Sequence, residues 1–148
     1  MSEFKGRNVL LVDDSIVRGT TSREIVQMAR DAGARKVYLA SAAPPVRYPN
    51  VYGIDMPTPI ELVAHNRTVA QIQEIIGCDA LIYQDVEGMK QAIGKLSSRI
   101  KDFDASCFDG VYVTGDITSE DIERLNENRV AEDESQADNS RLALPNPA

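Results

Sequence analysis

The sequence is poor in the residues on which many metal and nucleophilic sites depend. It has one histidine, His65, and two cysteines, Cys78 and Cys107, which stand far apart and form no CxxC pair. A lone histidine cannot make a catalytic triad or a metal site by itself, so we expect a structural or surface role for it. We expect the cysteines to be free thiols rather than a disulfide framework.

Long apolar runs and an excess of positive charge are also missing. No stretch approaches the ~20 apolar residues that a membrane span needs, and residues 1–7 lack the apolar run of a secretory signal, so a cytoplasmic location is expected. Sixteen basic residues face 23 acidic ones, which gives a net charge of −7. This balance argues against non-specific binding to nucleic acid or to a membrane, because both need a positive surface.

The residues that are present predict one α/β domain with a parallel sheet. The chain has 148 residues, of which 43% are hydrophobic, enough for one compact core. Residues 8–13 form a short continuous apolar run, typical of a strand buried on both faces. A helix over 20–32 and a second strand over 36–41 follow, which predicts a parallel pair joined by a right-handed crossover.

The rest of the chain alternates in the same way after a proline-rich, irregular stretch from 43 to 59. The further elements are expected as helix 68–76, strand 80–84, helix 86–97, a turn and short strand over 109–114, and helix 119–129 with Ser119 as its N-cap. Residues 1–129 are therefore expected to form the domain, and residues 130–148 an acidic, flexible tail.

One segment, residues 13–22, carries the chemistry. Asp13 and Asp14 stand at the carboxyl end of the first predicted strand, where open parallel sheets place their ligands. Gly19 follows in a short loop, and Thr20 and Thr21 open the first helix. A helix N-terminus presents unpaired N–H groups and a partial positive charge, which suit a phosphate.

The paired carboxylates and the loop at the helix start together predict a ligand with two different ends. One end is an anion held by the loop. The other end offers hydroxyls or a cation, because adjacent carboxylates repel unless something bridges them. A sugar phosphate with vicinal hydroxyls, accompanied by Mg²⁺, meets both demands.

Simpler interpretations stand beside this one. Paired acids after a strand also open response-regulator receiver domains, and Asp55 before Met56 resembles the phosphorylated aspartate of a receiver. A receiver, however, has no role for the glycine–threonine loop. The glycine and threonines alone would also fit an ordinary helix cap. Arg18 is equally compatible with a surface position and with contact to a phosphate.

The sequence of residues 9–22 resembles the signature with which type I phosphoribosyltransferases bind 5-phosphoribosyl 1-pyrophosphate (PRPP). Within that family it is most similar to the amidophosphoribosyltransferases. The resemblance continues through residues 38–44, 47–57 and 61–65, and weakly through 108–112.

The resemblance implies a glycosyltransferase of purine biosynthesis that makes phosphoribosylamine from PRPP and glutamine, and that purine nucleotides inhibit. It implies that Asp13 and Asp14 contact the ribose hydroxyls and Mg²⁺, and that residues 17–21 hold the 5-phosphate. The residues expected to bind PRPP are Asp13, Asp14, Ser15, Val17, Arg18, Gly19, Thr20 and Thr21.

The sequence also departs from this pattern. In the family a glutaminase domain and the first strands of the transferase fold precede the PRPP loop, so we expect an incomplete fold, no glutaminase cysteine and no turnover by this chain alone. A non-catalytic module that binds PRPP or a nucleotide, or that oligomerises, is the alternative. The missing strands also leave a sheet edge exposed, and we expect homo-oligomers to form through it. Some members carry an iron–sulfur cluster, with cysteines near the positions of Asn50 and Asp104 as well as at Cys107. Only Cys107 is present here, and two cysteines cannot build a four-thiolate site, so we expect no cluster.

Overall fold

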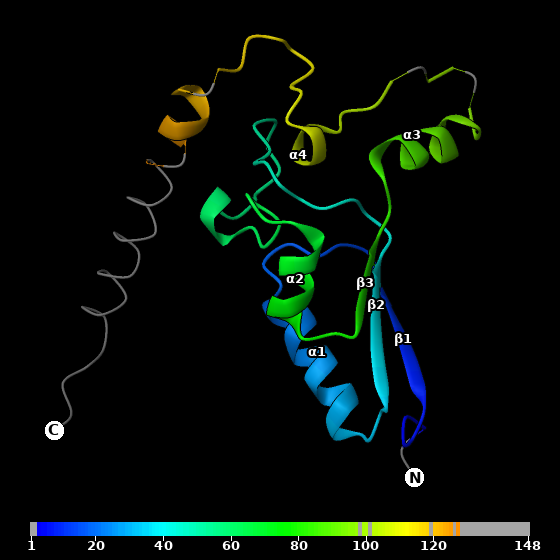
Figure 1. Cartoon of the computed structure of the whole chain (residues 1–148). Helices are drawn as coiled ribbons and strands as arrows, with labels where there is room; N and C mark the ends of the chain where they lie inside the picture. Colours follow the sequence, from blue (N-terminus) through cyan, green and yellow to red (C-terminus); the bar gives the residue numbers. More distant parts are fainter. Residues whose placement is uncertain (1–2, 98, 101, 119, 126, 128–148) are drawn as a thin grey trace, which may run out of the picture.

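The computed structural model describes residues 3–97, 99–100, 102–118, 120–125 and 127. Three parallel strands form one sheet in the order β1 (Asn8–Asp13), β2 (Lys36–Ser41) and β3 (Ala80–Tyr83). Helix α1 (Thr20–Asp31) connects β1 to β2, and α2 (Val69–Ile76) precedes β3. Both helices lie on the same side of the sheet (Figure 1). The α/β class and the parallel sheet are confirmed.

The core lies between the sheet and these two helices. The register aligns Leu11 with Leu39, and Leu39 with Leu81, across the three strands. Leu39 is 2% exposed and Leu81 8%, and they pack in one cluster with Val26 of α1 and Ile72 of α2. Alternate strand residues therefore point toward the helices, as the two-residue period of a strand requires.

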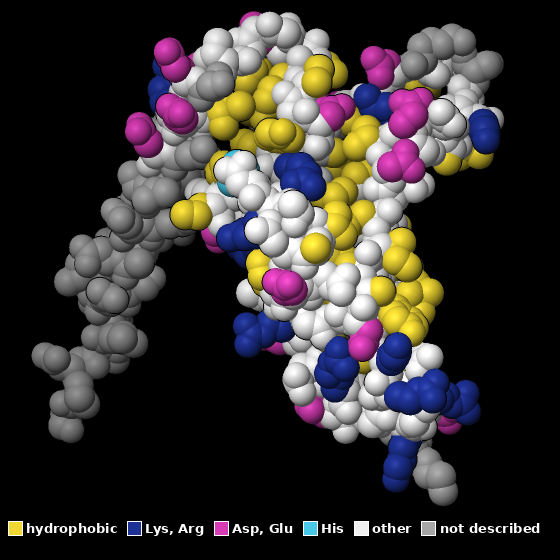
Figure 2. Space-filling model, viewed as in Figure 1, with side chains coloured by type: hydrophobic (Ala, Val, Ile, Leu, Met, Phe, Trp, Pro, Cys, Tyr) yellow, Lys and Arg dark blue, Asp and Glu magenta, His cyan; other side chains and the backbone are white. Residues whose placement is uncertain are grey.

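The opposite face of the sheet is open, so the prediction that β1 is buried on both faces was wrong. Leu10 is 55% exposed, Val12 71% and Ile82 54%. Figure 2 shows the apolar side chains gathered along this side of the molecule. A continuous apolar run identifies a strand with two apolar faces, but it does not say which segment covers each of them.

Smaller elements complete the described chain, and Pro59–Glu61 forms a short 3-10 helix, η1. Helix α3 spans Val86–Gly94, three residues shorter than predicted, and α4 spans Ser106–Asp109. Within the described residues no helix has the length and apolarity to cross a lipid bilayer.

The predicted strand within 109–114 was also wrong. Gly110 ends α4 with a φ of 75°, and within the described part of the chain residues 111–114 pair with no strand. Side chains fix this segment instead, because the hydroxyl of Tyr112 donates to the Pro49 carbonyl at 2.8 Å and Tyr112 meets the Tyr52 ring edge-on. Apolar alternation alone cannot distinguish a strand from an extended segment held in this way.

The last predicted helix begins near its expected position. Thr118 makes the hydrogen bonds of an N-cap, since its Oγ1 accepts the N–H of Asp121 at 3.2 Å. The expected cap, Ser119, lies outside the described residues, as does the predicted acidic tail over 130–148.

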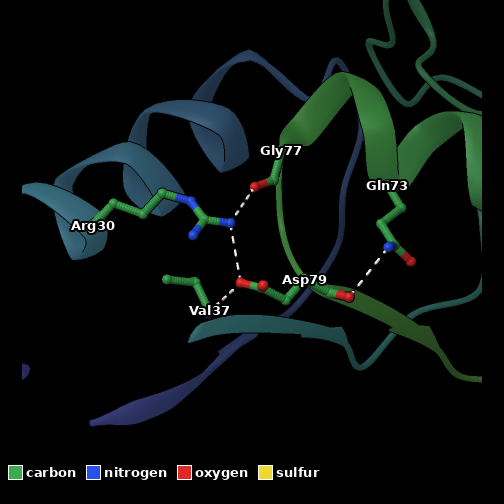
Figure 3. A network of polar contacts seen from close by, with 5 residues as sticks. All are labelled: Arg30, Val37, Gln73, Gly77 and Asp79. Carbon is green, nitrogen blue, oxygen red and sulfur yellow. Dashed lines mark hydrogen bonds and ion pairs between the residues drawn. The ribbon is translucent and has the colours of Figure 1, made fainter. Parts of the chain in front are cut away.

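A polar network joins both helices to the sheet (Figure 3). Arg30 Nη2 of α1 donates to the Gly77 carbonyl at the end of α2, at 2.7 Å, and to Asp79 Oδ2, at 3.0 Å. The same Asp79 oxygen accepts the Val37 N–H of β2 at 2.8 Å. The Val37 bond, and to a lesser extent Arg30, hold the pKa of the Asp79 carboxyl below its ordinary value. One carboxylate thus links α1, β2 and the segment that leads into β3.

Candidate ligand site at the carboxyl end of β1

The two predicted carboxylates lie where β1 leaves the sheet. Asp13 is the last residue of β1 and Asp14 is the first of the following loop. The carbonyl of Asp13 accepts the N–H of Ala42, and that of Asp14 accepts the N–H of Ala43, both at 2.9 Å. The pairing with the β2 chain therefore extends beyond the strands and fixes the backbone that carries both carboxylates.

Each carboxylate is oriented by the amide that follows it. Asp13 Oδ1 accepts the N–H of Asp14 at 3.0 Å, and Asp14 Oδ1 accepts the N–H of Ser15 at 2.7 Å. One oxygen of each carboxylate is therefore engaged in holding the side chain, while the second can meet a hydroxyl or a metal ion. Magnesium is commonly bound in this way, through one or two carboxylates together with oxygens of the substrate.

Helix α1 begins without a side-chain cap. Its N-cap is Gly19, in the left-handed conformation with a φ of 78°, and glycine has no side chain to accept the N–H groups of the first turn. By contrast, Thr68 accepts the N–H of Gln71 at the start of α2, and Asp85 accepts the N–H of Gly88 at the start of α3. The first turn of α1 therefore keeps its N–H groups available for an external acceptor.

The carboxylates and this helix start line one hollow of about 450 Å³. Its lining comprises Asp13, Asp14, Ser15, Val17, Arg18, Gly19, Thr20, Thr21, Ser22 and Pro57. The structure thus brings together all the residues that the sequence predicted for a PRPP site. It adds Ser22, which is 4% exposed, and Pro57, which comes from the irregular segment between β2 and α2.

A segment on the far side of that irregular stretch braces the loop. The N–H of Val63 donates to the Val17 carbonyl at 2.8 Å, and Arg18 Nε donates to Glu61 Oε1 at 3.1 Å. A Cβ placed on Gly19 would lie 3.0 Å from Val63 Cγ2, so the glycine is required by close packing as well as by its φ.

Sequence reasoning missed Glu61 and Val63 as neighbours of the loop. The only local signal was the Thr58-x-x-Glu61 spacing of a capping box, which the structure contains at η1. The pKa of the Glu61 carboxyl is lowered, first by the hydrogen bonds that Thr58 donates to it and then by the charge of Arg18. The capping spacing predicts a turn but gives no indication of Arg18, which lies 43 residues away in the sequence.

The lone histidine and the two cysteines lie outside this hollow. His65 Nδ1 is 2.9 Å from the Arg47 carbonyl, and Arg47 donates in turn to the Ala64 carbonyl at 2.8 Å, which matches the expected structural role. Cys78 and Cys107 are free thiols, as predicted, and burial raises the pKa of both.

Known proteins that are similar in sequence to this chain carry the same enzyme name. An amidophosphoribosyltransferase of Pasteurella multocida is 55% identical over 147 residues, which is 98% of the chain. The enzyme of the same name from Escherichia coli is 60% identical over 116 residues, and that from Saccharomyces cerevisiae 50% over 139 residues. The chain belongs to the amidophosphoribosyltransferase family. No protein-family model matches it.

Solved structures agree with this assignment. The glutamine PRPP amidotransferase from B. subtilis, complexed with ADP and GMP, superposes with a TM-score of 0.65 at 43% identity over 75% of the chain. A structure described as the allosteric regulatory enzyme of purine biosynthesis gives a TM-score of 0.66 at 42% identity. The resemblance to amidophosphoribosyltransferases is thereby confirmed, and these matches exclude the receiver domain.

The match covers only part of each relative. The chain spans 29% of the Pasteurella enzyme, 23% of the Escherichia coli enzyme and 25% of the B. subtilis chain. It corresponds to the carboxy-terminal phosphoribosyltransferase part of an amidophosphoribosyltransferase. The hollow described above lies wholly within this part.

Proposed function

We propose that this chain provides the ribose- and 5-phosphate-binding half of the PRPP site of an amidophosphoribosyltransferase. The observation that carries the proposal is a single hollow lined both by two carboxylates and by an uncapped helix start. The complete enzyme would replace the pyrophosphate of PRPP with an amino group derived from glutamine, which gives phosphoribosylamine for purine biosynthesis. The names of the relatives support this assignment.

The helix end of the hollow would hold the 5-phosphate. The N–H groups of Thr20 and Thr21 belong to the first turn of α1 and have no acceptor within the helix. Their hydroxyls add donors, and the helix dipole adds a partial positive charge. Gly19 has no side chain, so a phosphate oxygen can approach the backbone closely. A purine nucleotide carries the same 5-phosphate, and we propose that it competes for this loop.

The carboxylate end would hold the ribose hydroxyls and Mg²⁺. The residues fit such an ion, because Asp13 and Asp14 offer hard oxygen ligands. In each of them only Oδ1 accepts the following N–H, which leaves Oδ2 for the ion. The ion would neutralise the repulsion between the carboxylates and the phosphate groups of PRPP. Ser15 places a further hydroxyl at the same end of the hollow.

An amide NMR titration with PRPP and Mg²⁺ tests the proposal. We expect shifts concentrated at Gly19, Thr20 and Thr21, and added GMP should move the same amides to a second set of positions as it displaces PRPP. A folded chain whose spectrum ignores PRPP would contradict it.

Two variants separate the roles of the two ends. Asp13→Asn is expected to weaken Mg²⁺-dependent PRPP binding about tenfold or more, since an amide is a poorer ligand for magnesium. Binding of inorganic phosphate should stay within about twofold. Thr20→Val is expected to weaken phosphate binding at every Mg²⁺ concentration, by roughly fivefold for one lost hydrogen bond. Equal loss of both ligands in the Asp13 variant would contradict the assignment.

The alternative function is a binding module without turnover. The chain spans less than a third of the length of the named relatives, so binding in the hollow and the whole reaction are tested separately. PRPP binding without release of pyrophosphate in the presence of ammonia would establish the module. Release of pyrophosphate would establish catalysis by this part alone.

We also propose that copies of the chain associate through the edge of the sheet at β1. That strand pairs only with β2 among the described residues, and its exposed Leu10 and Val12 continue the edge into an apolar face. In sedimentation velocity we expect dimers at tens of micromolar, reduced several-fold by Val12→Lys. Met28→Lys on α1, where the residue is 69% exposed, should leave the dimer fraction unchanged. Monomers at all concentrations would contradict the proposal.

A further inference from the structure

Arg18 is held at one nitrogen and free at two. Its Nε donates to Glu61 Oε1 at 3.1 Å. Among the described residues, its two Nη groups have no hydrogen-bond acceptor. The side chain also lines the hollow and is 57% exposed. The guanidinium therefore keeps the pair of donors that suits two oxygens of a phosphate.

Glu61 is itself fixed by a second set of bonds. Its Oε2 accepts the N–H of Thr58 at 3.0 Å and the Thr58 hydroxyl at 2.9 Å. Thr58 is 7% exposed, so this anchor belongs to the packed part of the chain. The two oxygens of Glu61 thus have separate tasks, one toward the anchor and one toward Arg18. A freely rotating surface carboxylate could not impose a direction on its partner.

The same segment also fixes the backbone on both sides of Arg18. Val63 donates its N–H to the Val17 carbonyl at 2.8 Å, and its side chain packs on Gly19. Residues 58–63 therefore hold the loop before, at and after Arg18. An exposed ion pair contributes little to stability, so stability alone does not account for a carboxylate held in this way.

We propose that Glu61 is a positioning residue that directs the guanidinium of Arg18 toward the 5-phosphate of the ligand. This inference rests on the function proposed above, and it names two residues that determine the affinity of that site for a phosphate dianion. Arg18 would bind the phosphate through its Nη groups. Glu61 would touch no ligand atom and would act only through Arg18.

A double-mutant cycle with ribose 5-phosphate as the probe tests the inference. The dissociation constant is measured by calorimetry, without Mg²⁺, for wild type, Glu61→Ala, Arg18→Gln and the double variant. We expect Arg18→Gln to weaken binding about tenfold, as the loss of a charge-assisted pair. Glu61→Ala should weaken binding about fivefold in the wild type and leave it unchanged in the Arg18→Gln background.

Direct electrostatics predicts the opposite sign. If Glu61 acted on the phosphate only through its charge, its removal would tighten binding in both backgrounds, and that result would overturn the inference. Glu61→Gln keeps one oxygen for Nε, but its NH₂ group would then face the Thr58 N–H, so it should recover only part of the affinity that Glu61→Ala loses. Glu74→Ala, an exposed acid on α2, removes the same charge elsewhere and should have no effect.

The experiment also separates this inference from the proposed function. If wild type fails to bind ribose 5-phosphate, the proposed function fails, and the inference fails with it. If wild type binds and Glu61→Ala binds equally well, only the inference fails. The unfolding temperature of each variant, measured in parallel, shows whether the folded fraction accounts for any loss.

Discussion

Replacing Gly19 with alanine is expected to weaken the binding of ribose 5-phosphate at least about tenfold. Gly19 has a φ of 78°, a left-handed conformation that costs an alanine on the order of 1–2 kcal/mol. The new Cβ would also lie 3.0 Å from Val63 Cγ2 and 3.2 Å from Val63 Cβ, within van der Waals separation. The loop must therefore move, and the first turn of α1 moves with it.

A second glycine provides the matched control. Gly77 ends α2 with a φ of 80°, and a Cβ placed there would meet nothing within 4 Å. Gly77→Ala therefore carries the same backbone strain without a clash and away from the hollow. We expect it to lower the unfolding temperature but to leave the affinity unchanged. If both variants lost affinity to the same degree, general destabilisation would account for the effect.

The second large effect is expected in the core, where Ile72→Ala should lower the free energy of unfolding by about 2–5 kcal/mol. Ile72 is 0% exposed and lies in the cluster that joins α2 to α1 and the sheet. The substitution removes three carbon atoms from a packed site, and the surrounding elements can fill the cavity only in part. A loss of this size is a large share of the ~5–15 kcal/mol that stabilises a typical domain.

Urea denaturation of the variant and of Ile75→Ala measures this effect. Ile75 lies on the same helix but is 43% exposed, so its truncation should cost about 1 kcal/mol or less. The comparison holds helix propensity constant, because both changes are isoleucine to alanine within α2. Equal losses would mean that α2 does not pack as described.

Much of the fold was predictable because its signals are local. The bounds of β1 and β2 match the predicted 8–13 and 36–41, since each strand is an apolar run between polar residues or glycines. Helix α1 ends at Asp31, one residue before the predicted end, with Gly33 following as its stop signal. Such boundaries depend on neighbouring residues and need no knowledge of the tertiary structure.

The residues of the candidate site also divide into those with local sequence signals and those brought in from distant segments. Residues 13–21 could be chosen in advance because strand, loop and helix start are contiguous in the sequence. Pro57, Glu61 and Val63 could not, because they approach the loop only after the chain has passed through β2 and the proline-rich segment. The open face over Leu10 and Val12 was missed for the same reason, since coverage of a sheet depends on distant segments.

The bonds from the Asp13 and Asp14 carbonyls to Ala42 and Ala43 determine where the chain can tolerate changes in length. An insertion or deletion within β2 would shift these partners by one position and turn alternate side chains to the other face of the sheet. The carboxylates would then lose their place relative to the start of α1. The irregular stretch between Ala43 and Pro57 has no such register and is held by single contacts, such as the bond from the Tyr112 hydroxyl to the Pro49 carbonyl, so a change in length there should disturb those contacts and leave the strand pairing unchanged.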